Sequence, residues 1–277
     1  MTEPLTTPAV DLEAVKRKQQ ATWASGDYSA VAALIPIISE TLVDAADLRA
    51  GSRVLDVAGG SGNTALAAAR SFCDVVSLDY VPSLLERGRE RAAAEQLPVR
   101  FVEGDAEALP FEDASFDAVI SVVGVMFAPD HEQAAAELVR VCRPGGTIAL
   151  ASWTPQGFIG GLLKTVGKHV PPPAGVRPPT LWGDEDHLRG LLGTQVDPLR
   201  TERRTYTFRY RSPEHFVDYF ETYYGPTHKA FAALDDQGRA ALRADVVELV
   251  RSYDRLGDET AVAITAEYLE AVGTRAP

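Results

Sequence analysis

Cysteine is scarce in this sequence of 277 residues, which holds only Cys73 and Cys142 and no Cys-x-x-C pair. Two cysteines so far apart give no disulfide framework and no cysteine-based zinc site. The sequence therefore predicts a reducing environment, and we expect a cytoplasmic protein.

Long apolar runs are missing as well. The most apolar stretch, residues 118–128, is interrupted by Ser121 and Gly124. It falls well short of the ~18 residues that are needed to cross a bilayer. The N-terminus has neither the basic segment nor the apolar core of a signal peptide. We expect a soluble protein without a membrane partner.

Positive charge is in deficit, with 27 Lys and Arg against 39 Asp and Glu and a net charge of −12. Such a surface repels phosphate backbones and anionic membranes, so we expect no nucleic-acid partner. The five histidines are scattered, with no i, i+4 pair and no cysteine partner, and we expect no metal. The sequence leaves the oligomeric state open, a homodimer included.

From about residue 51, short apolar runs alternate with amphipathic stretches. This alternation predicts a parallel sheet covered by helices on both faces. We expect strands over 53–57, 75–79, 99–103, 116–121 and 147–153. The flanks are expected to hold helices over 11–25, over 29–48 with a kink or offset at Pro36, and over 212–251. They are also expected to hold strands over 201–210 and near 263–275.

Three units follow from this pattern. Residues 1–50 form an N-terminal helical cap, and residues 51–154 form the main α/β core. Residues 155–277 supply the remaining strands, with a helical substrate cap inserted at about 212–255.

A glycine-rich turn joins the first predicted strand to an alanine-rich helix in VLDVAGGSGNTALAAAR (54–70). Residues 60–65, GSGNTA, match the G-x-G-x-x-G/A pattern of a dinucleotide site. Asp79 ends the second strand 23 residues after Asp56, where an acid can accept both hydroxyls of a ribose. The alternatives are a purely structural turn and an Asp79 that only caps a helix.

The charges around this turn do not favour a diphosphate. A pyrophosphate is bound by bare amides without a nearby anion, yet Asp56 precedes the turn and residues 54–69 contain no Lys or Arg. A carboxylate there suits a ligand that carries an ammonium or sulfonium group. A NAD-dependent oxidoreductase fits the glycine pattern, but no Tyr-x-x-x-Lys pair lies near the core.

Further motifs follow in order: GDAEALPFEDASFDAVIS (104–121) and RPGG before the fifth strand. With the glycine turn and Asp79, this series resembles the class I S-adenosylmethionine-dependent methyltransferases over roughly residues 50–153. The resemblance is strongest to the small-molecule branch that includes the ubiquinone and menaquinone C-methyltransferases. It implies a Rossmann-like, mostly parallel seven-stranded sheet with an antiparallel last strand, plus a helical cap.

The resemblance also implies the cofactor, S-adenosyl-L-methionine, and its contacts. The residues it assigns are Tyr28, Asp56, Ala58, Gly59, Gly60, Gly62, Asp79, Tyr80, Val81, Asp105, Ala106 and Ser121. Asp56 would hold the amino end, Asp79 the ribose and Asp105 the adenine. Ala58 replaces the first motif glycine, which binding should tolerate if that position needs no positive φ.

Methyl transfer from a sulfonium requires mainly orientation and exclusion of water, whereas an oxygen nucleophile usually also needs a base. We take His228 and Tyr224 in the cap as candidate catalytic groups. Candidate substrate-lining residues are Trp23, Met126, Phe127, Tyr219 and Tyr223. The alternative is that these aromatics only pack the cap and its helices, and that His131 caps a helix.

The expected function is therefore methylation of a hydrophobic small molecule at O, C or N. Because no base is obvious, a second reading stays open. It is an enzyme that keeps the cofactor but uses its charge to catalyse a cyclisation or rearrangement.

Overall fold

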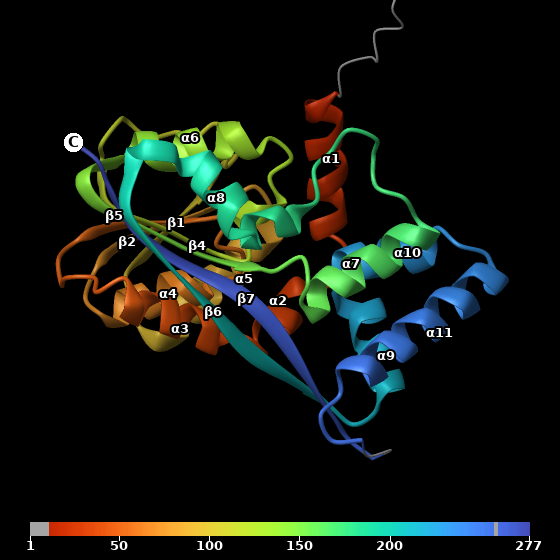
Figure 1. The fold of residues 1–277 in the computed structure, drawn as a ribbon. Helices are drawn as coiled ribbons and strands as arrows, with labels where there is room; N and C mark the ends of the chain where they lie inside the picture. The colour runs from red at the N-terminus through yellow and green to blue at the C-terminus, as the bar shows by residue number, and fades with distance from the viewer. Residues whose placement is uncertain (1–10, 258–259) are drawn as a thin grey trace, which may run out of the picture.

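The fold is built on a seven-stranded sheet. A computed structural model describes residues 11–257 and 260–277 of the protein, so the first ten residues of the predicted N-terminal unit lie outside it. The strands are β1 (Arg53–Val57), β2 (Asp74–Asp79), β3 (Val99–Glu103), β4 (Phe116–Val122), β5 (Cys142–Trp153), β6 (Val196–Tyr210) and β7 (Val262–Arg275). Their order in the sheet is β3-β2-β1-β4-β5-β7-β6 (Figure 1).

Strands β1 to β5 pair in parallel, and β7 is antiparallel to both of its neighbours. The expected fold, a mostly parallel Rossmann-like sheet with an antiparallel last strand, is confirmed. Strand β6 begins at Val196, five residues before the predicted strand, because its pairing with β7 continues as far as Arg275.

Helices cover both faces of the sheet. They are α1 (Leu12–Trp23), α2 (Tyr28–Ala32), α3 (Pro36–Ala45), α4 (Asn63–Arg70), α5 (Pro82–Glu95), α6 (His131–Val141), α7 (Phe158–His169), α8 (Glu185–Leu192), α9 (Pro213–Tyr223), α10 (Gly225–Ala232) and α11 (Asp236–Tyr253). Short 3-10 turns are η1 (Val125–Phe127), η2 (Pro179–Gly183) and η3 (Gly193–Gln195). In Figure 1, α3 and α4 lie on one face, and α6 and α8 lie on the other.

The central strands are apolar on both sides because both sides are covered. Val54, Leu55 and Val57 of β1 are fully buried. The alanines of α4 are buried as well, and their small side chains let this helix pack closely on the strands. The predicted helix over 29–48 is two helices, since α3 begins at Pro36, a residue suited to the first helical position.

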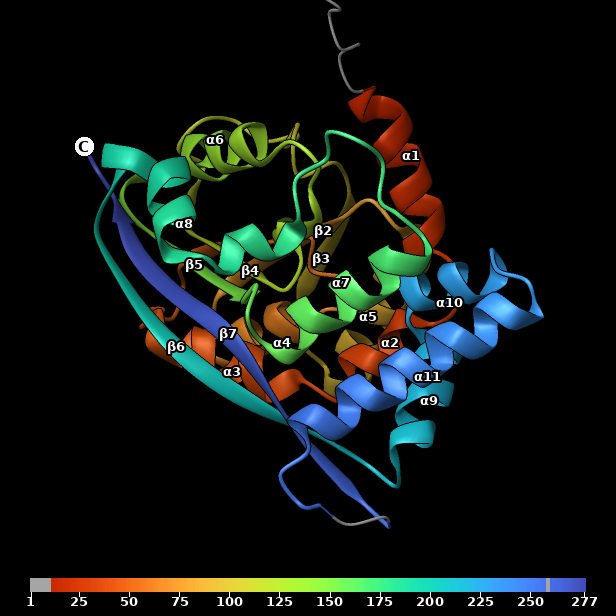
Figure 2. The ribbon, with the colours of Figure 1, turned by 45° about the vertical axis from the view of Figure 1, so that its right-hand side comes forward.

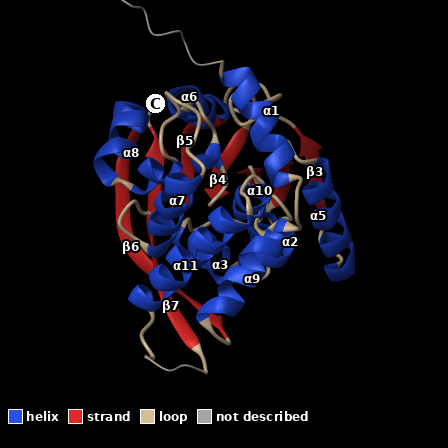
Figure 3. Ribbon diagram, turned by 90° about the vertical axis from the view of Figure 1, so that its right-hand side faces the viewer, coloured by secondary structure: helices blue, strands red, loops and turns tan. Residues whose placement is uncertain are grey.

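Helices α7, α9, α10 and α11, which we call the cap, pack against one another beyond the end of the sheet. Figure 2 shows the long strands β6 and β7 running from the sheet to the cap. The cap core is aromatic: the rings of Phe216 and Phe220 stack at 4.2 Å, and Phe158 meets Phe216 at 5.2 Å. Helix α1 lies against α10 and completes this side of the molecule (Figure 3).

Candidate active site

A cavity lies where the parallel strands β1 to β4 end. Ligands of open α/β sheets bind at this edge, because the strand order reverses there and the loops diverge. Ten residues named from the sequence line it: Trp23, Tyr28, Ala58, Gly60, Asp79, Tyr80, Val81, Asp105, Ala106 and Phe127. Ten others complete the wall: Lys16, Gln19, Leu78, Leu84, Gly104, Val123, Gly124, Val125, Ala128 and Pro129.

The glycine turn needs its glycines for two different reasons. Gly60 has φ +55° and lines the cavity, and a Cβ placed on it would meet nothing within 4 Å. Gly59 has no such space, since its Cβ would come within 2.4 Å of the Asp56 carboxylate and 2.3 Å of the Ser77 hydroxyl. Gly59 therefore lets the turn close onto the sheet, and Gly60 exposes bare backbone to a ligand.

Ala58 differs from the sequence-based expectation. Its φ is +53°, so this position does adopt the left-handed conformation that glycine tolerates best. The methyl group lines the cavity beside Gly124, whose own Cβ would lie 2.3 Å from the Ala58 carbonyl oxygen. The turn therefore carries local strain that a glycine would remove.

Asp56 lies beneath the turn rather than in the cavity wall. Its Oδ2 accepts hydrogen bonds from the Ala65 amide at 3.1 Å and the Ser77 hydroxyl at 3.4 Å. Its Oδ1 is buried and has no protein partner. Burial raises the pKa of this carboxyl to about 8. In the structure Asp56 holds the start of α4, and its contact with a cofactor amino group stays a prediction.

Asp79 is 5% exposed at the end of β2, and it lines the cavity. Its Oδ2 accepts from the Gly60 amide at 2.9 Å, and its Oδ1 accepts from the Val81 amide at 2.8 Å. A carboxylate can accept about four hydrogen bonds, so each oxygen keeps capacity for a ligand hydroxyl. Burial raises the pKa of Asp79 to about 6.

Asp105 follows β3, and each of its two carboxylate oxygens accepts a hydrogen bond. Its Oδ1 accepts from the Glu107 amide at 2.9 Å, and its Oδ2 accepts from Lys16 Nζ at 2.8 Å. Lys16 was not predicted as a site residue. It shares one face of α1 with Gln19 and Trp23, at helical spacings of three and four residues, and that pattern could have revealed it.

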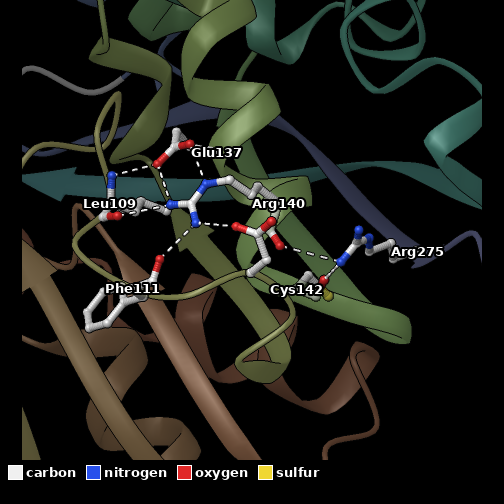
Figure 4. Close-up of polar contacts among 7 residues, drawn as sticks. Leu109, Phe111, Glu137, Arg140, Cys142 and Arg275 are labelled. Atoms are coloured by element: carbon white, nitrogen blue, oxygen red, sulfur yellow. Dashed lines mark hydrogen bonds and ion pairs between the residues drawn. The ribbon is translucent and has the colours of Figure 1, made fainter.

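The loop after Asp105 is held in place by Arg140 and Glu137 (Figure 4). Arg140 on α6 donates to the carbonyl oxygens of Leu109 at 3.0 Å and Phe111 at 2.8 Å. It also forms a two-pronged ion pair with Glu137, whose Oε2 accepts from the Leu109 amide at 2.7 Å. Removing the Arg140 side chain would leave the two carbonyl oxygens without this donor and Glu137 without its cation.

Ser121 and Met126 do not line the cavity. The Ser121 hydroxyl donates to the Val57 carbonyl at 2.7 Å and accepts from the Val125 amide at 3.0 Å. It therefore ties β1 to η1 from behind the cavity wall. Met126 is fully buried in the core, while its neighbour Phe127 lines the cavity.

Trp23, Tyr28 and Phe127 form what we call the aromatic end of the cavity. The Trp23 ring meets Tyr28 at 5.3 Å and Phe127 at 4.8 Å, both edge to face. Tyr224 packs behind them, 5.6 Å from Trp23, and does not line the cavity. Two further predicted residues, Tyr219 and Tyr223, lie on α9 outside the lining.

None of the five histidines lines the cavity. His228 lies on α10, where its Nδ1 is 3.0 Å from the Glu221 carbonyl oxygen. His131 begins α6 after the Asp130 cap, but it is buried, and its Nδ1 lies 3.1 Å from His187 Nε2. Burial lowers the pKa of His131 to about 4. The assignment of His228 as a base stays a prediction without a contact to the cavity.

Residues 11–257 and 260–277 contain neither a cluster of metal ligands nor a membrane-spanning helix. No group of three His, Cys, Asp or Glu side chains could hold a metal ion there. No helix in this part of the chain is both long and apolar enough to cross a membrane.

These residues fit S-adenosylmethionine. The bare backbone at Gly60 leaves room for the methionine part, and Asp79 can accept from a ribose. Gln19 lines the cavity, and its buried side-chain oxygen has no hydrogen-bond partner among the described residues. This oxygen can therefore accept a hydrogen bond from a ligand. No Lys or Arg is present in the turn to pair a pyrophosphate.

The sequence is similar to those of known proteins. Residues 55–150 match the sequence family described as "Methyltransferase domain". An uncharacterized protein of Mycobacterium tuberculosis is 45% identical over 252 residues, which cover 89% of this chain and 92% of the relative. A demethylmenaquinone methyltransferase of Deinococcus radiodurans is 41% identical over 127 residues, or 44% of this chain and 53% of that protein.

The fold is shared with solved structures. The crystal structure of the YcgJ protein of Bacillus subtilis matches 86% of this chain and 99% of its own, with a TM-score of 0.59 at 20% identity. Sequence family, fold and cavity agree, and the chain belongs to the class I S-adenosylmethionine-dependent methyltransferases.

Proposed function

We propose that this enzyme methylates a hydrophobic, aromatic small molecule in the cytoplasm. The observation that carries the proposal is the composition of the cavity. Its charged lining residues, Lys16, Asp79 and Asp105, all lie at the ends of β2 and β3 or on the helix above them. The remainder of the wall, including the aromatic end, bears no charge.

The order of the strands supports the placement of the acceptor. Asp79 ends β2 and Asp105 follows β3, so the adenosine part of the cofactor belongs over that side. The glycine turn follows β1, and Val125 and Phe127 follow β4 on the opposite side. The donor sulfur and the acceptor therefore belong near η1 and the aromatic end.

S-adenosylmethionine, when bound, supplies a methyl group on a positively charged sulfur that is already activated for displacement. The protein's part is to bind, orient and exclude water. Asp79 holds the sugar, and the rings of Trp23 and Phe127 keep water away from the reacting end. Burial and the nearby Asp79 raise the pKa of the Tyr28 hydroxyl, so it keeps its proton and serves as a donor.

The described cavity lining, which holds no imidazole, supports an acceptor that needs no histidine base. An acceptor that is nucleophilic without a protein base suits this wall best, such as an electron-rich ring carbon. The similarity to a demethylmenaquinone methyltransferase supports the inclusion of demethylmenaquinone among the test compounds. The acidic surface, with a net charge of −12, supports a small-molecule acceptor over a nucleic acid.

Transfer of a labelled methyl group to a panel of apolar aromatic compounds tests the proposal. We expect a labelled product together with S-adenosylhomocysteine. Trp23→Ala should lower kcat/KM for the acceptor by about tenfold or more while cofactor affinity changes by less than about threefold. Phe72→Ala is the control, because Phe72 is 81% exposed and is not among the residues that line the cavity.

The same assay addresses the second reading of the sequence. A product that forms without label and without S-adenosylhomocysteine would favour the cyclisation or rearrangement enzyme over the methyltransferase. If neither product forms with any apolar compound, while a charged acceptor is methylated, the proposed acceptor class is wrong.

A further inference from the structure

Helix α1 contacts the loops that follow three successive strands. The Gln20 side-chain amide donates to the Tyr80 carbonyl after β2. Lys16 reaches Asp105 after β3, and Trp23 meets the Phe127 ring after β4. Lys16, Gln19 and Trp23 all line the cavity, so α1 forms its roof.

Lys16 is the charged contact of this roof. Its Nζ lies 2.8 Å from Asp105 and 3.2 Å from Glu107, and 2.8 Å from Glu13 of its own helix. The side chain is 16% exposed, so solvent screens these pairs only partly. Lys16 thus joins the roof to the carboxylate that the motif series assigns to the adenine.

Glu107 makes this contact costly to lose. Its side chain is 5% exposed, and its Oε1 accepts from the Asp130 amide at 2.8 Å. Without Lys16, two neighbouring carboxylates would face each other with no cation between them. An unpaired buried charge is strongly destabilising, so the loop after β3 depends on this lysine.

The two ends of α1 are attached differently. Its C-terminal end touches the cap backbone to backbone: a Cβ on Gly225 would lie 2.2 Å from the Thr22 carbonyl oxygen. A Cβ on Gly26, just after the helix, would lie 2.9 Å from the Tyr223 carbonyl oxygen. Val15 is the one buried residue of α1, so apart from this side chain the N-terminal half is held chiefly by the ion pairs of Lys16.

We propose that Lys16 is a positioning residue that latches α1 over the cofactor and sets the rate at which the cofactor is exchanged. The latch opens at the N-terminal half of α1, while the C-terminal end stays attached to the cap. Asp105 retains acceptor capacity while bonded to Lys16, so adenine and the latch can be bound together. This inference depends on the cofactor and not on the identity of the acceptor.

A consequence concerns the order of binding. Trp23 lies on the same helix as Lys16 and forms part of the aromatic end where the acceptor is proposed to bind. Closing the latch therefore fixes one wall of the acceptor site. Cofactor enters first, and S-adenosylhomocysteine leaves last, when α1 opens again.

The test measures S-adenosylhomocysteine dissociation by surface plasmon resonance, and hydrogen exchange of the amides in residues 12–23. In Lys16→Met we expect dissociation to accelerate about tenfold or more, the size of a lost charge-assisted hydrogen bond. Exchange in the first two turns of α1 should rise in the cofactor-bound variant.

Lys18→Met is the matched control, because Lys18 is exposed on the same helix and its side chain has no hydrogen-bond or ion-pair partner among the described residues. It should leave both readouts within about twofold of wild type. In wild-type protein, raising the salt concentration should accelerate dissociation, and in Lys16→Met it should have little effect.

The proposal is overturned if Lys16→Met releases S-adenosylhomocysteine at the wild-type rate, or if exchange in α1 does not change. It is equally overturned if salt accelerates dissociation from wild type and Lys16→Met alike. Because none of these readouts involves an acceptor, their failure is distinct from failure of the proposed acceptor class.

Discussion

The backbone amide of Gly60 donates a hydrogen bond to Oδ2 of Asp79 over 2.9 Å. This bond joins the glycine turn after β1 to the end of β2, so the part of the site proposed to hold the methionine end and the part proposed to hold the ribose are one unit. A change in the charge of Asp79 should therefore be felt in cofactor binding as a whole.

Cofactor affinity should fall in mild acid. The pKa of Asp79 is raised to about 6 by burial, and a protonated carboxyl accepts fewer hydrogen bonds from a ribose. Affinity should thus be full above about pH 7 and decline as the pH drops through 6. Calorimetric titrations from pH 5 to 8 check this.

Asp79→Asn should weaken binding about tenfold or more and flatten the pH profile. Asp74→Asn, at the exposed start of the same strand, should retain the wild-type profile. An Asp79→Asn variant that keeps the acid-side loss would show that another group causes it.

Asp56→Asn should stabilise the cofactor-free protein at alkaline pH. The carboxyl has a pKa of about 8 when folded against an ordinary value of 3.8, because burial penalises its charge. The unfolded carboxyl ionises near pH 4, whereas the folded one keeps its proton up to about pH 8. The free energy of unfolding therefore has its full value below pH 4 and falls as the pH rises towards 8. The amide has no charge to lose, so the free energy of unfolding should increase at pH 8 on the order of 2–4 kcal/mol.

Urea unfolding of wild type and Asp56→Asn at pH 5 and pH 8 measures this difference. The increase in the free energy of unfolding that Asp56→Asn brings should be much larger at pH 8 than at pH 5. Comparing the two proteins at each pH cancels the titration of the groups that both share. Equal gains at the two pH values would contradict a raised pKa at Asp56.

Ala58→Gly should increase stability. Ala58 has φ +53°, where the Cβ costs about 1–2 kcal/mol, and the greater freedom of unfolded glycine offsets part of that gain. We expect a net increase of about 0.5–1 kcal/mol in the free energy of unfolding. Ala93→Gly, at an exposed position in α5, should instead lower it by a similar amount. Two changes of the same sign would contradict the strain at Ala58.

Arg140→Met should be among the more damaging substitutions outside the cavity. It leaves Glu137 partly buried without its cation and frees the Leu109 and Phe111 carbonyls. We expect a loss of about 2–4 kcal/mol in the free energy of unfolding, measured in urea. The exposed pair of Arg251 with Glu214 provides the comparison, and Arg251→Met should cost less than about 0.5 kcal/mol.

The sequence predicted the core well because its signals are local. Parallel strands end at one edge, so Asp79 and Asp105 had to approach each other once β2 and β3 were recognised. The apolar run after β4 likewise indicated a cavity wall. The 3-10 turn there places Phe127 in the cavity lining and Met126 in the core. That division depends on one turn of helix, which composition does not reveal.

Long-range packing explains what the sequence did not show. Lys16 belongs to the site because α1 crosses the ends of the strands, and its partner Asp105 is 89 residues away. His131 resembled an exposed helix start, but Trp182 and His187 from a later segment bury it. The left-handed conformation of Ala58 reflects the closure of Gly59 onto Asp56 and cannot be read from an alanine.

Crystals grown with S-adenosylhomocysteine test the central claim most directly. The account predicts the ribose on Asp79, the adenine between Tyr80 and Asp105 beneath Lys16, and the sulfur facing Phe127 and the aromatic end. A ligand bound elsewhere, or one whose sulfur faces β3 while its adenine lies against Phe127, would contradict it.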